Sequence, residues 1–121
     1  MERVVHFEMF ADQPDRAAKF YSDIFGWKFQ KWDGNQDYWL ITTGEEGMGI
    51  NGGMANRMSP EIQTINTIGV ASVDECVGKV TEAGGSIMMP KTTIPGIGYL
   101  AYCRDTEGNA FGIMQPDMSA Q

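Results

Sequence analysis

VVHFEMFADQPDRAAKFYSDIFG (residues 4–26) and TINTIGVASVDECVGKVTEAGG (residues 64–85) decide the fold, because each reads as a strand followed by a helix. In the first stretch Asp12 can cap the helix, Pro14 suits its first turn, and Gly26 suits its end. In the second stretch an apolar stripe of helical spacing ends at a pair of glycines. The two stretches lie about sixty positions apart, which indicates a structural repeat.

Three short strand-like segments follow each of these stretches, separated by Gly, Asn and Asp as expected of turns. Residue types of the first half recur 59 to 61 positions later in the second half. The matching pairs are Asp15 and Asp74, Gly26 and Gly85, Tyr38 and Tyr99, and Glu46-Gly47 and Glu107-Gly108. The sequence therefore predicts an α+β fold made of tandem βαβββ modules.

The repeat also predicts where the modules begin and end within a single domain over residues 1–121. The first module covers about residues 3–54 and the second about residues 64–115, with residues 55–63 as the linker. In the second module, PKTTIPGIG (residues 90–98) carries two prolines and two glycines. We expect it to be a loop between strands that could shape or cover a ligand site.

Composition restricts the classes of partner. The chain of 121 residues is 42% hydrophobic and 21% charged, as in ordinary globular proteins, with a net charge of −7. This negative charge argues against nucleic acid and anionic membranes as partners. No apolar run is long enough to span a bilayer, and no signal peptide is expected. Cys76 and Cys103 lack metal-site spacing, which favours a reduced, cytoplasmic setting.

At this point the sequence resembles a known family. FYSDIFGWKF (residues 20–29), DTEGNAFGIMQ (residues 105–115) and the repeat itself are similar to the vicinal oxygen chelate superfamily, in its glyoxalase-related branch. That superfamily includes glyoxalase I, extradiol dioxygenases, methylmalonyl-CoA epimerase and the bleomycin and fosfomycin resistance proteins. The resemblance implies two βαβββ modules that form a curled mixed sheet around a cleft, a small-molecule ligand, and a homodimer.

The resemblance also implies positions for metal ligands, which fall on His6, Asn51, Asn66 and Gly112. Catalytic divalent metals usually need about three imidazole or carboxylate ligands, with one coordination position left open. One imidazole, two amides and a glycine do not provide this set. His6 is therefore interpreted as a vestigial ligand, and no cofactor is expected. A divalent metal (Zn, Ni, Fe or Mn) is disfavoured.

His6 and Glu8 lie two positions apart in a strand, so both can point to the same face. A carboxylate close to an imidazole can raise the histidine pKa toward neutral pH and favours a general base. His6 and Glu8 are therefore the candidate catalytic residues. The alternative is that His6 only hydrogen-bonds a neighbouring strand or a water molecule.

Five further residues are candidates for ligand binding, and each has a structural alternative. Tyr38 and Tyr99 occupy equivalent places in the two modules and could line a cleft or simply pack in the core. Asn51 and Asn66 stand at the implied ligand positions. Lys91 could meet a substrate carboxylate, although most surface lysines meet only water.

Two functions follow as hypotheses, and a third stays open. The first is a lyase or isomerase that abstracts a proton from a small molecule, with His6 or Glu8 as the base. The second is a non-catalytic protein, like the bleomycin resistance members, that sequesters a small aromatic or cationic compound. A dimeric regulatory or scaffolding domain is the third.

Overall fold

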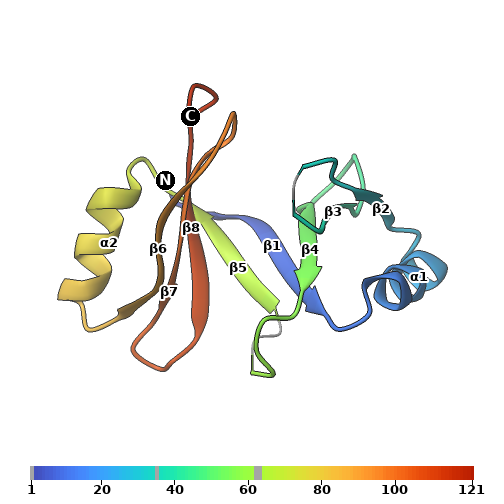
Figure 1. Cartoon of the computed structure of the whole chain (residues 1–121), viewed down its shortest axis with the longest axis horizontal. Helices are drawn as coiled ribbons and strands as arrows, with labels where there is room; N and C mark the ends of the chain where they lie inside the picture. The colour runs from blue at the N-terminus through green and yellow to red at the C-terminus, as the bar shows by residue number, and fades with distance from the viewer. Residues whose placement is uncertain (1, 35, 62–63) are drawn as a thin grey trace. The chain divides into compact units, whose positions relative to one another are not determined.

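The computed structural model describes residues 2–34, 36–61 and 64–121 (Figure 1). Within these residues the order strand, helix, three strands occurs twice, which confirms the predicted α+β fold and its repeat. The elements are β1 (Val4–Ala11), α1 (Pro14–Phe25), β2 (Lys28–Lys31), β3 (Tyr38–Thr42), β4 (Gly52–Asn56), β5 (Thr64–Gly69), α2 (Val73–Glu82), β6 (Ser86–Ile94), β7 (Gly98–Arg104) and β8 (Ala110–Pro116).

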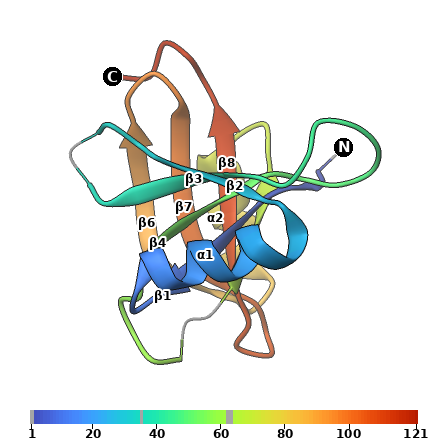
Figure 2. The same ribbon diagram turned by 90° about the vertical axis from the view of Figure 1, so that its right-hand side faces the viewer.

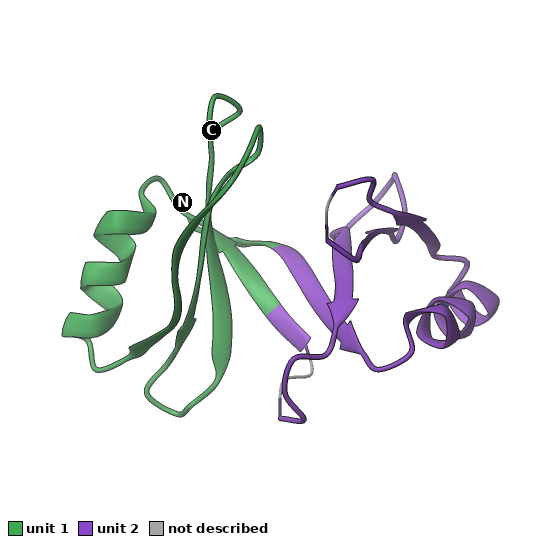
Figure 3. Cartoon of the chain, in the orientation of Figure 1, with its two compact units in different colours: residues 1–5, 66–121 green, residues 6–65 purple. Residues whose placement is uncertain are grey.

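The chain divides into two compact units, which Figure 3 shows in different colours. Unit 2 is residues 6–65, and unit 1 is residues 66–121 together with residues 1–5. The start of the chain belongs to unit 1 because its backbone bonds there: the Gly69 amide donates to the Arg3 carbonyl at 2.9 Å. The unit boundary therefore falls inside β1, whereas the repeat pattern had placed the first module at about residues 3–54.

Unit 2 has the strand order β2-β3-β4-β1, in which β1 and β4 are parallel and the other pairs antiparallel. Its core consists of Ala11, Ile41 and Met54, all at most 7% exposed, with Trp27 and Trp39 packed against them. Helix α1 lies in front of β1 and β4 in the view of Figure 2. The helix contributes small side chains to this core, and none of its residues is fully buried.

Unit 1 has the strand order β5-β8-β7-β6, in which β5 and β8 are parallel. Ser72 caps the start of helix α2: its hydroxyl accepts a hydrogen bond from the Glu75 amide at 3.1 Å. The core of this unit lies between α2 and the sheet, and its buried members are Val70, Val73, Ala101, Cys103 and Ile113. The burial of Cys103 raises its thiol pKa, as expected of a structural cysteine.

The start of α1 differs from the prediction. Asp12 does not cap the helix; Gln13 takes the N-cap position and makes no side-chain capping bond. The Asp12 carboxylate instead forms an ion pair with Arg57, whose Nε lies 3.4 Å away. The two residues are 45 positions apart in the sequence, so no local pattern predicts this contact. The predicted stop is confirmed, because Gly26 ends α1 in the left-handed conformation with φ 74°.

The prediction of a loop over residues 90–98 is wrong for most of its length. Strand β6 continues to Ile94 and pairs with β7, Thr92 opposite Leu100 and Ile94 opposite Gly98. The β-branched run after Pro90 favours a strand, and the proline is accepted because β6 is an edge strand with register shifts around this point. Only residues 95–97 remain as the turn.

The linker is also shorter than predicted. Strand β4 extends to Asn56, so the first two residues of the predicted linker, 55 and 56, are strand residues. The last two linker residues, 62 and 63, lie outside the described residues. Among the helices that the structure describes, none has the length and apolar character needed to cross a membrane.

Candidate functional site

Three polar side chains of unit 2 meet on one face of its sheet. The Tyr38 hydroxyl donates to Oε2 of Glu8 at 3.0 Å, and Nε2 of His6 lies 3.2 Å from the same hydroxyl oxygen. The His6 and Glu8 side chains are 3.8 Å apart. The carboxylate side chain is only 11% exposed, whereas the imidazole is 34% exposed. The imidazole is therefore the member of this group that an incoming ligand can reach.

The strand pattern explains how these residues come together. His6 and Glu8 alternate with the core-facing residues of β1, so both point away from α1. Tyr38 likewise alternates with Trp39, which packs in the core. Strand β4 lies between β1 and β3, and its residue opposite Glu8 is Gly53. The Tyr38 side chain passes over this glycine to reach the carboxylate.

The number of protons available determines which atom donates in each hydrogen bond between His6, Tyr38 and Glu8. Burial raises the pKa of Tyr38 far above its usual value, and the charge and hydrogen bond of Glu8 add to the effect. Tyr38 is therefore protonated at neutral pH, and its single proton goes to Glu8. Nε2 of His6 must then donate to the Tyr38 oxygen, which leaves the basic lone pair of a neutral imidazole on Nδ1.

The two asparagines singled out from the sequence are not part of this group. The Asn51 carboxamide oxygen accepts bonds from the Thr43 amide and hydroxyl at 2.9 and 3.2 Å, so it holds the loop before β4. Asn66 lies in β5 of unit 1, exposed, with Phe111 as its register partner. Gly112 is paired with Thr67 on the neighbouring register position.

Tyr99 and Lys91 are brought together within unit 1. Nζ of Lys91 lies 4.6 Å from the centre of the Tyr99 ring and 3.1 Å from Oδ2 of Asp74. Tyr99 also packs against the apolar core of this unit. The two tyrosines that the repeat relates therefore have different surroundings: Tyr38 donates a partly buried hydrogen bond to a carboxylate, and Tyr99 is a packing residue beneath a lysine.

The donors around His6 do not match the ligand set of a catalytic metal. One imidazole nitrogen and one carboxylate lie within reach of each other, and both already bond to Tyr38. Across the described parts of the chain, no group of three or more His, Cys, Asp or Glu side chains is placed to hold a metal ion. A third strong ligand is what a catalytic site would require.

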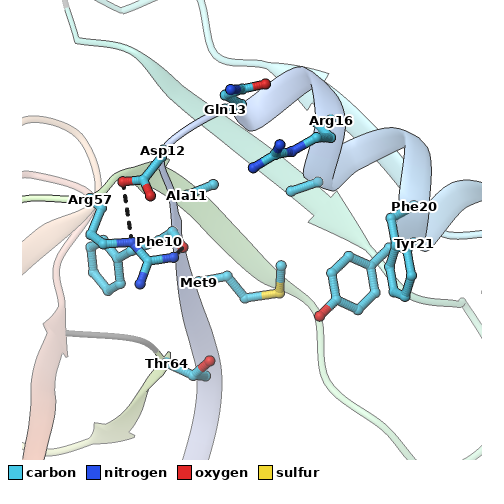
Figure 4. A pocket seen from close by; sticks show the side chains of 11 residues that line it. Met9, Phe10, Ala11, Asp12, Gln13, Arg16, Phe20, Tyr21, Arg57 and Thr64 are labelled. Carbon is cyan, nitrogen blue, oxygen red and sulfur yellow. Dashed lines mark hydrogen bonds and ion pairs between the residues drawn. The ribbon is translucent and has the colours of Figure 1, made fainter. Parts of the chain in front are cut away.

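Sequence reasoning missed one residue of this site and one cavity. Gly53 is needed for the approach of Tyr38, and its signal was the Gly-Gly pair inside a strand, which often marks a close contact. The cavity, of about 480 Å³, lies between α1 and β1 in unit 2 (Figure 4). Arg16 and Arg57 line it, and no spacing in the sequence relates these two residues.

The sequence of this chain is similar to known proteins of one family. Residues 3–113 match the family model described as "Glyoxalase/Bleomycin resistance protein/Dioxygenase superfamily". The chain is 32% identical over 106 residues to the protein named "Putative glyoxylase CFP32" of Mycobacterium bovis, and equally to that of Mycobacterium tuberculosis. These matches cover 82% of the chain and 40% of each relative, so the chain spans less than half the length of the curated relatives it matches.

Solved structures show the same fold at low sequence identity. The hypothetical protein BH1468 from Bacillus halodurans C-125 superposes with a TM-score of 0.70 at 15% identity, covering 99% of this chain and 98% of that one. A glyoxalase/bleomycin resistance protein/dioxygenase superfamily member from Vibrio splendidus 12B01 gives 0.67 at 15%, covering 97% and 100%. Methylmalonyl-CoA epimerase from Mycobacterium tuberculosis gives 0.64 at 13%, covering 93% and 87%.

Proposed function

The chain belongs to the glyoxalase/bleomycin resistance protein/dioxygenase superfamily, and on that premise we propose that it is a lyase or isomerase in which His6 removes a proton from a small carbonyl compound. The observation that carries the proposal is the Tyr38 hydroxyl, which joins His6 at 3.2 Å to Glu8 at 3.0 Å. A base needs an accessible lone pair and a group that stabilises the charge it acquires.

His6 meets both requirements. Its imidazole is the exposed member of the group, and the lone pair lies on Nδ1 because Nε2 donates to Tyr38. When Nδ1 takes a proton from the substrate, the ring becomes a cation whose Nε2 is 3.8 Å from the Glu8 carboxylate. Glu8 and Tyr38 thus act as positioning residues that fix the tautomer and stabilise the imidazolium. General base catalysis of this kind is worth about 10²- to 10⁴-fold in rate.

We propose that this chemistry proceeds without a bound metal. Support comes from the donor set: His6 and Glu8 are both occupied by Tyr38, and the implied third position, Asn51, is occupied by Thr43. Removal of a proton from a carbon next to a carbonyl leaves the electron pair of the C–H bond in an enolate, whose carbonyl oxygen carries the charge until the carbon is protonated again. The substrate class is therefore a compound with such a C–H bond, as in the methylmalonyl-CoA of the epimerases that share the fold.

A test is hydrogen–deuterium exchange at carbon, followed by ¹H NMR in D₂O after treatment of the protein with EDTA. Methylmalonyl-CoA and the hemithioacetal of methylglyoxal and glutathione serve as the two probes. Wild-type protein should replace the C–H hydrogen of at least one probe by deuterium, so that its ¹H signal disappears. His6→Ala should lower that rate by about 100-fold or more, and Tyr38→Phe should lower it less. Met48→Ala, a change at a fully exposed loop residue, is the control and should leave it unchanged.

Three results would count against the proposal. Absence of exchange with both probes would contradict the proposed activity. An unchanged exchange rate in His6→Ala would contradict the assignment of His6 as the base. Exchange that disappears with EDTA and returns with added Ni²⁺ or Zn²⁺ would remove the metal-free mechanism.

The second candidate is a binding protein without catalysis. It is supported by the net charge of −7 and by the buried Glu8 carboxylate, which favour a cationic ligand. Calorimetric titration with an aromatic cation distinguishes the two functions. Saturable binding that Glu8→Gln abolishes, in a protein that exchanges neither probe, would favour sequestration over catalysis.

A further inference from the structure

We propose that unit 2 holds a second small-molecule site, between α1 and β1, which takes a ligand with an apolar body and one carboxylate. The cavity has a volume of about 480 Å³, within the range of roughly 300–1,000 Å³ that is usual for small-molecule sites. It is separate from the His6 group, because Met9 and Ala11 line it from the face of β1 opposite to His6 and Glu8.

One end of the cavity is basic. Arg57 is held in place, since Nη2 donates to the Phe10 carbonyl at 3.2 Å and Nε lies 3.4 Å from Asp12. Its side chain is 28% exposed, and the residue lines the cavity. Arg16 extends from the first turn of α1 toward the same end (Figure 4). Two guanidinium groups and one carboxylate leave a positive charge here, although the whole chain carries −7. A guanidinium pair of this kind suits a carboxylate ligand.

The other end of the cavity is apolar. Phe20 and Tyr21 stand next to each other on α1, with ring centres 5.1 Å apart and planes at 82°. The Met9 side chain extends toward Tyr21 from β1 (Figure 4). The Tyr21 ring stacks on the Trp27 ring, with ring centres 5.0 Å apart and an interplanar angle of 10°, and this contact holds it in place. Phe20, which lines the cavity, is 55% exposed. A flat apolar ligand body would cover it.

The charge and shape together define the ligand. A molecule whose carboxylate meets Arg16 and Arg57 would place its apolar part over Phe20, Tyr21 and Met9. An uncharged analogue would lose the charged hydrogen bonds, and a cation would be repelled. Naphthalene-2-carboxylate has these properties and is the probe; naphthalene-2-carboxamide is its neutral counterpart of the same shape.

The experiment is a calorimetric titration of the full chain with both probes, followed by NMR of methyl-labelled methionine. We expect the carboxylate to bind at least about fivefold more tightly than the carboxamide. Arg16→Gln should weaken the carboxylate about three- to tenfold and reduce this preference. Lys19→Gln is the matched control: it removes the same charge from the same helix, but Lys19 pairs with Asp23 and does not line the cavity. The Met9 methyl signal should shift on binding, and that of Met48, in an exposed loop, should not.

Several outcomes would overturn the second site. These are equal affinity for carboxylate and carboxamide, equal effects of Arg16→Gln and Lys19→Gln, an unmoved Met9 signal, or no saturable binding up to 10 mM probe. The His6→Ala variant keeps this test apart from the proposed catalysis. It should bind naphthalene-2-carboxylate as the wild type does, whether or not the wild type exchanges protons with a substrate.

Discussion

Gly53 lies directly beneath Tyr38: a Cβ atom added to Gly53 would overlap the hydroxyl oxygen and the ring of the tyrosine. The two residues come from neighbouring strands, β4 and β3, and Glu8 faces Gly53 from the other side in β1. The tyrosine can therefore cross from β3 to a carboxylate on β1 only because the strand between them has no side chain at this position. The whole hydrogen-bonded group depends on this gap.

Gly53→Ala should expel Tyr38 from Glu8. The new methyl group would overlap the hydroxyl oxygen and the ring of Tyr38, so the tyrosine side chain has to move. We expect a loss of about 1–3 kcal/mol in the free energy of unfolding, measured by urea denaturation. The exchange rate should fall to that of Tyr38→Phe or below, because His6 loses its partner.

Gly44→Ala is the control for this variant, since no atom lies within 4 Å of a Cβ added there and its φ is not positive. It should change the free energy of unfolding by less than about 0.5 kcal/mol. Wild-type stability in Gly53→Ala would show that Tyr38 does not occupy the position described.

Tyr38→Phe should change how stability depends on alkaline pH. The pKa of Tyr38 is raised in the folded state, so the unfolded chain loses this proton first, near the ordinary tyrosine value of about 10. The contribution of Tyr38 is therefore complete below that pH and declines above it, with a slope of at most about 1.4 kcal/mol per pH unit. The Tyr38→Phe variant lacks this decline. The difference in the free energy of unfolding between the wild type and this variant should therefore shrink between pH 9 and pH 11.5.

The measurement is urea denaturation at four pH values in that interval. Glu8→Gln should flatten the decline in part, because the carboxylate contributes to the raised pKa through its charge and its hydrogen bond. Parallel curves for the wild type and Tyr38→Phe above pH 10 would contradict the assignment of a buried, protonated tyrosine.

The two helices should respond in opposite ways to changes at their N-caps. Ser72→Ala removes the hydroxyl that accepts from the Glu75 amide and should cost about 1 kcal/mol. Gln13→Ser supplies such a hydroxyl to α1, where the present residue makes no capping bond, and should add about 0.5–1 kcal/mol. Thermal denaturation of both variants measures these changes. A loss of stability in Gln13→Ser would mean that the backbone at this position cannot present a cap.

Ile113→Ala should be among the most destabilising single changes in unit 1. This isoleucine is 1% exposed and contacts the cluster that joins α2 to the sheet. Truncation in such a core costs about 2–5 kcal/mol. Ile97→Ala removes the same atoms from a turn residue that is 48% exposed, and it should cost under about 1 kcal/mol. Denaturant titration of the pair tests the core; equal losses would contradict it.

The repeat could be predicted from the sequence because its signals are local. Gly26 ends α1 where expected, and the hydrophobic stripes of both helices follow the helical period. Pro90 misled the prediction for β6, because a proline is tolerated in an edge strand, and the outer side of β6 pairs with none of the described strands. Asp12 misled the prediction of the cap, because its ion pair with Arg57 is a long-range contact that no local pattern contains.

The candidate site was predicted only in part, for a related reason. The alternation of β1 places His6 and Glu8 on one face, and this much is visible in the sequence. The link to Tyr38 depends on the registers of β1 with β4 and of β4 with β3, which set Gly53 between the two. Registers of this kind are fixed by packing across the sheet, and a single sequence does not state them.

The division of the chain has a consequence for the order in which the protein is synthesised. All of unit 2 is contained in residues 6–65, so it can fold on the ribosome as soon as that segment has emerged. Unit 1 needs residues 1–5, which leave the ribosome before unit 2 does, and β8, which ends at Pro116. The hydrogen bond from the Gly69 amide to the Arg3 carbonyl can therefore form only after the residues between them, more than half of the chain, have been synthesised. A cut in the linker would therefore place residues 1–5 on a different fragment from the rest of unit 1.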